Sequence, residues 1–417
     1  MQMLLQILSI PTAAILLVIL TFIIFLSPLL LNLAEKLQQN KWGSKKLPPG
    51  PKPLPIIGNL HMLFGKHPNR SLEALATKYG PIMSLKLGQV PAVVVSSSEV
   101  AQLFLKTHDI VFANRPKLQL AEIIPYARKG FIFTDYGDYW RHVRKLCAMQ
   151  FLSASKIEMF GPLRNKELGV LVNTLKKASN SGDVVDLSEL IDEVVANIAD
   201  TMILGGSKDD KFDTTGIIFE AMHSAGAFNL GDYFPILGLF DLQGLQRTTK
   251  KAFQLADEVM EKIINDHQQP SSAKSPNHNK DLIDILLSHM NQSMEDSHDH
   301  HEQRLIGRTN IKAIAMDMTA AAYDTSKSTF EWGMSELLKN PTTMKKLQKE
   351  IEDLVGINRQ VEEEDLDKLP YLDMVVKEIL RLHPPVPFLL PHESSEDVTI
   401  NGYFIEKNTR ILVNVWQ

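Results

Sequence analysis

The most constraining feature of the sequence is its first 34 residues, which carry no charged side chain. Residues 13–31 are apolar except for Thr21, Ser27 and Pro28, and roughly 20 apolar residues are enough to cross a bilayer. A cleaved signal peptide would begin with basic residues and have an apolar run of only about 7–15 residues. A buried core helix is the other alternative. We expect residues 1–34 to be a transmembrane helix that anchors the chain in membrane lipid.

Basic residues follow this stretch directly. Lys36, Lys41, Lys45 and Lys46 stand against the single acid Glu35. Positively charged residues mark the cytosolic end of a membrane span. The sequence therefore predicts a single-pass protein whose bulk lies on the cytosolic side.

Residues 35–55 are expected to form a basic, proline-rich hinge. Proline fixes its own φ and restricts the residue before it, so closely spaced prolines stiffen a linker. They stand here at Pro48, Pro49, Pro51, Pro53 and Pro55. Residues 56–417 show no internal repeat, and we expect them to form one domain.

That domain is predicted to be mainly α with small β-sheets. Helical apolar spacing without internal proline covers residues near 137–152, 185–204, 248–267 and 309–339. Short strands are expected at Ile82–Leu87, at Ala92–Ser96 and over residues 411–416. Asn401-Gly402 between two short apolar runs predicts a hairpin, because both residues tolerate positive φ.

Charge and cysteine usage exclude several classes of function. The formal net charge is -5 and the isoelectric point about 6.2, so no nucleic-acid partner is expected. Cys147 is the only cysteine, which excludes an internal disulfide, a zinc ribbon and a cysteine-ligated iron–sulfur cluster. One cysteine in a chain of this length is typical of a reducing compartment.

Trp140 and Arg144 form the first candidate site. They are four residues apart in a predicted helix and therefore share a face. Both side chains donate N–H groups and accept none, so together they suit an anion such as a carboxylate. An ordinary basic amphipathic helix is the alternative, because Arg141 and Lys145 lie beside them.

The second candidate site lies in the middle of the predicted helix 309–339. Three successive alanines, 320 to 322, leave part of its surface bare, so a flat ligand can approach the backbone. Asp324 and Thr325 place an acid and an alcohol beside them, which suits a proton relay. Thr325 is expected to bond back to the Ala321 carbonyl. A helix with one solvated aspartate is the alternative.

Glu378 and Arg381 are the third candidate pair. They lie three residues apart in a predicted helix over residues 371–383, so they face the same way. We expect an ion pair, which would need further hydrogen bonds if it were buried. A pair with this spacing is common on helix surfaces and alone indicates no function.

One histidine-rich run could suggest a metal. His298, His300, His301 and Glu302 lie in a polar stretch between predicted helices. Metal ligands need outer groups that orient them, and this stretch offers none. We predict no metal site there.

The order of these features carries more information than any one of them. A membrane span, a proline-rich hinge, W-R-x-x-R at 140–144, A-A-x-D-T-S at 321–326 and E-x-x-R at 378–381 follow one another, with P-P-V-P-F and P-H-E-S behind them. Over its whole length the chain resembles the cytochromes P450, most closely the plant-type microsomal enzymes. The resemblance implies the P450 fold for residues 56–417 and an anchor in the endoplasmic reticulum membrane.

A monooxygenase, an oxidoreductase of secondary metabolism, is the implied enzyme. Its cofactor would be haem b and its partner NADPH–cytochrome P450 reductase, with one oxygen atom from O2 entering an apolar small molecule. The substrate pocket would draw on residues near 116–131, 228–240, 316–325 and 386–391.

The resemblance also implies roles for single residues. Trp140 and Arg144 would bond one haem propionate, and His392 would help at the other. Asp324 and Thr325 would belong to the oxygen-activation groove. The remaining assignments are the haem-contacting Ala321 and Ala322 and the structural pair Glu378 and Arg381.

One departure from the family pattern is large. The family carries its thiolate ligand in an F-x-x-G-x-R-x-C-x-G loop, and no such loop occurs in the 417 residues. Cys147 lies three residues after Arg144 and is expected to be a buried structural thiol. Because a P450 uses its thiolate to favour O–O cleavage, we expect a C-terminally incomplete P450 fold, a fragment without a thiolate centre.

Two alternatives to a catalytic P450 remain open. One is a non-catalytic truncated P450 product that keeps the anchor and its partner contacts. The other is a membrane-tethered, lipid-binding helical protein unrelated to haem, which the ordered motifs argue against.

Overall fold

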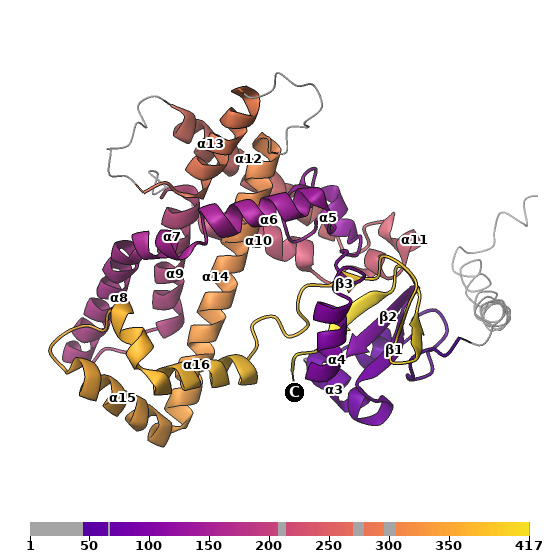
Figure 1. Cartoon of the computed structure of the whole chain (residues 1–417), viewed down its shortest axis with the longest axis horizontal. Helices are drawn as coiled ribbons and strands as arrows, with labels where there is room; N and C mark the ends of the chain where they lie inside the picture. The colour runs from indigo at the N-terminus through magenta and orange to yellow at the C-terminus, as the bar shows by residue number, and fades with distance from the viewer. Residues whose placement is uncertain (1–44, 66, 207–213, 270–278, 296–305, 417) are drawn as a thin grey trace, which may run out of the picture. The chain divides into compact units, whose positions relative to one another are not determined.

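A computed structural model of the chain describes residues 45–65, 67–206, 214–269, 279–295 and 306–416 (Figure 1). The chain divides into two compact units. The first combines the residues up to Phe112 with Glu393–Asn414. The second contains Ala113–His392 and the residues after Asn414.

The first unit is built on a four-stranded sheet in the order β1-β2-β6-β3. β1 and β2 are antiparallel, and Gly88 in their short connection has a φ of 61°. β6 pairs with β2 in parallel, and a separate hairpin pairs β4 with β5. The strands are β1 Ile82–Leu87, β2 Val90–Val95, β3 His392–Glu393, β4 Val398–Ile400, β5 Tyr403–Ile405 and β6 Arg410–Val413.

The strand predictions are confirmed, with shifted bounds. β2 begins at Val90, so Pro91, which precedes the expected start of the strand, is its second residue. A missing N–H donor is tolerated near the start of a strand. Asn401 and Gly402 have φ values of 49° and 78°, as the predicted hairpin turn requires. The helices of this unit are η1 Leu60–Met62, α3 Pro68–Tyr79, α4 Ser98–Gln102 and the π-helix η2 Leu103–Thr107.

The last part of the predicted hinge is tied to this sheet. Ser84 N donates to the Pro49 carbonyl oxygen at 2.8 Å, and Ser84 Oγ donates to the Pro48 carbonyl oxygen at 2.8 Å. A Cβ on Gly50 would lie 2.0 Å from the Ser84 carbonyl oxygen, so only glycine fits this contact. The proline-rich segment therefore runs along β1.

The second unit is helical. The helices predicted near 137–152, 185–204, 248–267 and 309–339 are confirmed as α6, α9, α12 and α14. Its helices are α5 Gln119–Ile123, η3 Ala127–Lys129, α6 Asp138–Gln150, α7 Ala154–Met159, α8 Gly161–Ser181, α9 Leu187–Leu204, α10 Thr214–Gly226, η4 Leu230–Asp232, α11 Pro235–Gly238, α12 Leu245–Gln268, α13 Leu282–Glu295, α14 Arg308–Lys339, α15 Pro341–Val355, η6 Glu363–Lys368 and α16 Pro370–Leu382.

Helix ends in this unit follow local chemistry. Pro341 and Pro370 begin α15 and α16, at positions where no backbone donor is needed. Asp186 caps α9 by accepting from Glu189 N at 3.2 Å.

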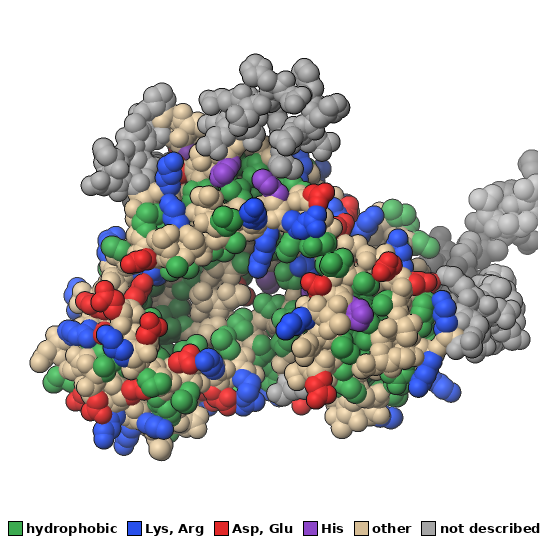
Figure 2. Space-filling view, viewed as in Figure 1, with side chains coloured by type: hydrophobic (Ala, Val, Ile, Leu, Met, Phe, Trp, Pro, Cys, Tyr) green, Lys and Arg blue, Asp and Glu red, His purple; other side chains and the backbone are tan. Residues whose placement is uncertain are grey.

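Charged and hydrophobic side chains are intermixed on the surface over α15 and α16 (Figure 2).

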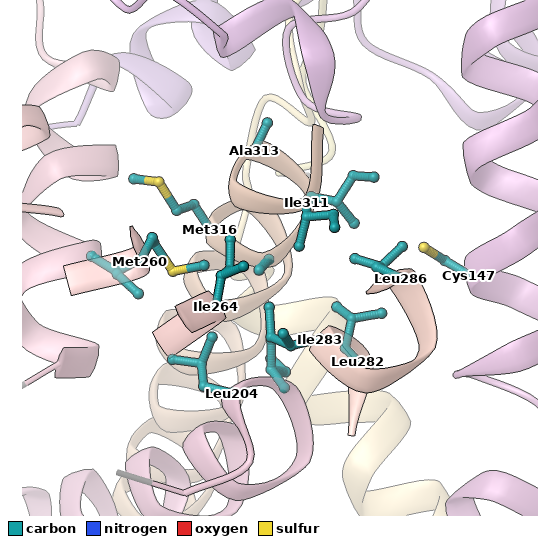
Figure 3. Packing of buried hydrophobic residues seen from close by; sticks show 14 of the residues in the cluster. Cys147, Leu204, Met260, Ile264, Leu282, Ile283, Leu286, Ile311, Ala313 and Met316 are labelled. Atoms are coloured by element: carbon teal, nitrogen blue, oxygen red, sulfur yellow. The ribbon is translucent and has the colours of Figure 1, made fainter. Parts of the chain in front are cut away.

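The core of the second unit surrounds the first half of α14, a helix of 32 residues. Ile311, Ile314 and Ala315 of this half are fully buried. α9, α10, α12 and α13 pack against α14, and Figure 1 shows α12 and α13 beside its first half. In Figure 3, Met260 of α12 and Leu286 of α13 lie in the same hydrophobic cluster. The buried half of α14 thus holds the helices of this unit together.

Two predicted segments lie outside the described residues: the anchor at 1–34, with the start of the hinge, and the histidine-rich run His298–Glu302. Within the described ranges, no helix combines the length and the apolar character that a membrane span needs. The anchor therefore stays a prediction.

Candidate functional site

The predicted acid–alcohol pair lies where α14 leaves the core. Thr319 is fully buried, whereas Ala321 and Asp324 are exposed and Thr325 is half-buried. Thr325 Oγ1 donates to the Ala321 carbonyl oxygen at 2.8 Å, as predicted. Thr329 Oγ1 makes the same contact with the Thr325 carbonyl oxygen at 2.8 Å. An acid and an alcohol therefore stand next to each other on an open stretch of helix.

Trp140 and Arg144 lie together on α6, as their spacing predicts. The guanidinium carbon of Arg144 is 5.8 Å from the centroid of the Trp140 ring, within cation–π range. Trp140 is half-buried and Arg144 is exposed. Arg141 instead pairs with Asp138 one turn earlier. The donors of Trp140 and Arg144 thus share one helix face, which suits an anionic group.

Glu378 and Arg381 form the expected ion pair, but the pair is not buried. Arg381 Nε and Nη2 each lie 2.7 Å from a carboxylate oxygen of Glu378. The side chains of Arg381 and Glu378 are 58% and 54% exposed. No part of the described chain covers this side of α16, where Val376 and Leu380 are exposed as well. Among the described residues, Glu378 and Arg381 therefore form a surface pair.

An apolar groove of about 580 Å³ lies between α14, α15 and α16. Its polar lining comes from Thr325, Ser326 and Thr329 of α14, and hydrophobic side chains provide most of the rest. A Cβ on Gly333 would lie 2.9 Å from Ile379 Cδ1, so glycine lets α14 and α16 approach closely. The alcohol of the candidate site therefore borders a hydrophobic groove.

The other predicted cofactor contacts lie on two elements. Ala321 is exposed and Ala322 is half-buried on α14. His392 is half-buried at the start of β3. The contacts that the family resemblance implies for these three residues stay predictions.

Cys147 is not suited to act as a thiolate ligand. Its side chain is 3% exposed and lies inside the hydrophobic cluster shown in Figure 3. Burial raises the pKa of the thiol to about 12, and the charge of Arg144 offsets this only in part. The thiol is therefore neutral near pH 7, whereas metals bind the thiolate. The described residues thus offer donors for the carboxylates of a haem but no axial thiolate.

Asp317 is a buried acid that the sequence-based predictions did not include. Its Oδ2 accepts hydrogen bonds from the backbone N–H groups of Phe131 at 2.6 Å and Ile132 at 3.0 Å. Burial raises the pKa of the carboxyl to about 7, while the two backbone donors act in the opposite direction. A single acid in the otherwise apolar run 313–318 was the available signal.

A second missed group joins the ends of two helices. One potential ligand atom from each of His267, Asp281 and Asp284 lies within 4.8 Å of the others. Asp281 Oδ1 accepts from Asp284 N at 2.8 Å and so caps α13, while its Oδ2 lies 3.1 Å from His267 Nε2. These contacts tie the end of α12 to the start of α13. No spacing in the sequence signals a pair that is 14 residues apart.

The family model for cytochrome P450 matches residues 48–417, which covers both units and every candidate site residue. The chain belongs to the cytochrome P450 family. Members of this family are haem-thiolate monooxygenases that use a redox partner and small-molecule substrates. The mainly helical architecture with small sheets, predicted from the sequence, is confirmed for this P450.

Several plant cytochromes P450 are similar to this chain. Cytochrome P450 CYP736A12 of Panax ginseng is 50% identical over 372 residues, which is 89% of this chain and 73% of the relative. Premnaspirodiene oxygenase of Hyoscyamus muticus is 40% identical over 397 residues, 94% of this chain and 77% of the relative. Costunolide synthase of Cichorium intybus is 38% identical over 379 residues, which is 89% of this chain and 73% of the relative.

We predict that Asp317 lowers the stability of this P450 as the pH rises from about 4 to about 7. The carboxyl has an ordinary pKa of 3.8 and a folded pKa of about 7, so the folded chain holds a proton that the unfolded chain has released in this window. Between pH 5 and 8 the resulting loss in the free energy of unfolding is at most about 3 kcal/mol.

Urea unfolding at pH 5 and pH 8 measures this effect, with Asp317→Asn as the matched variant that cannot titrate. The free energy of unfolding of the wild type should fall more between the two pH values than that of the variant. Equal pH dependence in the two chains would contradict the prediction.

Proposed function

We propose that this P450 inserts one oxygen atom from O2 into an apolar small molecule, with electrons from NADPH that arrive through NADPH–cytochrome P450 reductase. Family membership supports the reaction class, and one relative is named an oxygenase. The observation that carries the proposal is the Asp324–Thr325 pair on the open stretch of α14, beside a hydrophobic groove. An acid and an alcohol bordering an apolar space suit delivery of the protons that oxygen activation consumes, next to a bound apolar molecule.

The proposed roles follow from the contacts of each side chain. Asp324 is exposed and can exchange protons with water. Thr325 can pass a proton from Asp324 toward the apolar groove once its hydroxyl no longer donates to the Ala321 carbonyl oxygen. Trp140 and Arg144 would hold one propionate of haem b, and His392 would help at the other. Haem, when bound, supplies the iron at which oxygen is activated.

The proposed location is the endoplasmic reticulum membrane. The uncharged residues 1–34 and the four lysines that follow support a single-pass anchor with the bulk of the chain on the cytosolic side.

For the 417-residue polypeptide itself, we propose that no haem-thiolate centre forms. Cys147 is its only cysteine, and its buried thiol has a raised pKa. The carbon-monoxide difference spectrum of the reduced, purified chain should show a histidine-type Soret band or no haem. Cys147→Ala is the control and should give the same spectrum. A thiolate-type band that this substitution abolishes would overturn the proposal.

A non-catalytic role is the second candidate for this polypeptide, and the burial of Cys147 favours it. Contact with the reductase would remain in either case. We assign that contact to α6, because Arg141 and Lys145 are exposed on it and cations favour an acidic partner surface.

We predict that reversing both charges, Arg141→Glu with Lys145→Glu, weakens binding of the soluble reductase domain at least about tenfold at low salt. The salt dependence of binding should flatten, because fewer charges are left to screen. Surface plasmon resonance with the immobilised chain measures both quantities. Lys176→Glu with Lys177→Glu is the control, since these exposed residues of α8 give the same change in net charge. An equal loss in the control would show a general charge effect and no α6 site.

A further inference from the structure

The end of α12 and the start of α13 meet at a contact between His267 and Asp281 that the proposed function does not use. His267 Nε2 lies 3.1 Å from Asp281 Oδ2, and the two side chains are 8% and 1% exposed. A Cβ on Gly205, directly after α9, would lie 2.5 Å from Asp281 Oδ2 and 2.8 Å from His267 Nε2. Glycine therefore lets the end of a third helix close over this buried pair.

The ring of His267 is oriented by a group outside this contact. Its Nδ1 lies 2.7 Å from the Ile263 carbonyl oxygen. A carbonyl oxygen can only accept, so Nδ1 carries the hydrogen, and Nε2 of the neutral ring is then an acceptor. This acceptor faces a second acceptor, the carboxylate oxygen of Asp281. Two acceptors at this distance need a cation between them, which is either a proton on Nε2 or a metal ion.

Asp284 brings a second carboxylate to the same place. One potential ligand atom from each of His267, Asp281 and Asp284 lies within 4.8 Å of the others. A proton on His267 would set one positive charge against two negative charges, whereas a divalent cation balances both carboxylates. Buried charge that is left unbalanced is costly. The charge of the cluster therefore favours a divalent ion over a proton.

The helix ends around the cluster favour positive charge as well. α9 ends at Leu204 and α12 ends at Gln268, so two helix C-termini, which carry partial negative charge, lie at the cluster. α13 begins there with partial positive charge, but Asp281 Oδ1 accepts from Asp284 N at 2.8 Å and so caps this end. Asp281 can thus cap α13 with one oxygen and offer the other to a cation.

The types of ligand atom indicate which ion fits. One imidazole nitrogen with carboxylate oxygens suits Zn²⁺, whereas Mg²⁺ and Ca²⁺ prefer oxygen ligands alone. Two ligands of a tetrahedral zinc ion lie about 3.3 Å apart when each bond is about 2.0–2.1 Å long. The distance of 3.1 Å between His267 Nε2 and Asp281 Oδ2 is close to this value. A ligating imidazole also donates its other N–H to an oxygen that orients the ring, as His267 does to Ile263.

We propose that His267, Asp281 and Asp284 bind one Zn²⁺ ion, with water as the fourth ligand, and that the ion joins the end of α12 to the start of α13. The site is structural and independent of the proposed monooxygenase reaction. Because the ligands come from two helices, the unfolded chain has no preformed site, and binding should stabilise the folded chain.

Isothermal titration calorimetry of the purified, metal-free chain with zinc chloride tests the site. The histidine-rich run is first removed by His298→Ala, His300→Ala and His301→Ala. One Zn²⁺ ion per chain should then bind, and Asp284→Asn should weaken binding at least about tenfold, because one anionic ligand is lost. Asp266→Asn is the matched control, since Asp266 is exposed next to His267 and the substitution removes the same charge. It should change the affinity by less than about threefold.

X-ray absorption at the zinc edge reads the ligands without any substitution in the cluster. The bound ion should have one imidazole ligand, with oxygen atoms as the others. Two or more imidazoles, or a sulfur ligand, would place the ion elsewhere and overturn the proposal, as would equal weakening by Asp284→Asn and Asp266→Asn. If no saturable binding occurs up to about 0.1 mM Zn²⁺, the cluster holds only a proton, as an ion pair of His267 and Asp281, and the proposal falls.

Discussion

Burial of the first half of α14 is the constraint on which the second unit depends. A helix that is packed on all sides must pair its polar groups inside the protein. Lys312 does so through Asp257 and Glu261 of α12, at 2.7 and 2.6 Å. Asp317 does so through the backbone of the 126–134 loop. The same burial therefore fixes α12 and this loop, and through the core cluster α9, α10 and α13.

The second half of α14 is partly exposed, unlike the first half. From Ala321 onward the helix is open on one side, and α15 and α16 leave an apolar groove beside it. Asp324 and Thr325 lie at this change from buried to open, where a proton can come from water and still reach an apolar space. The donors Trp140 and Arg144 match the carboxylate side of a haem, whereas Cys147 belongs to the core. The described residues thus combine an acid–alcohol pair and an indole–guanidinium pair with a buried cysteine whose pKa is raised.

Local patterns predicted what depends on local geometry. Helix spacing was enough for the pairs Trp140–Arg144 and Glu378–Arg381, because residues three or four apart must share a face. Spacing cannot say what covers that face, so it left open whether the Glu378–Arg381 pair is buried or lies on the surface. The loop contact of Asp317 spans 186 residues, and no local pattern encodes it. Only the isolated acid in an apolar run hinted that a distant partner exists.

Native-state hydrogen exchange along α14 tests most directly whether this helix has a buried, structural half and an open, functional half. We expect the amides of residues 312–319 to exchange only through global unfolding, because their side chains are packed on all sides. Those of residues 323–330 should exchange through local opening, at least about a hundredfold faster. Uniform protection along the whole helix would contradict the division on which the proposed function rests.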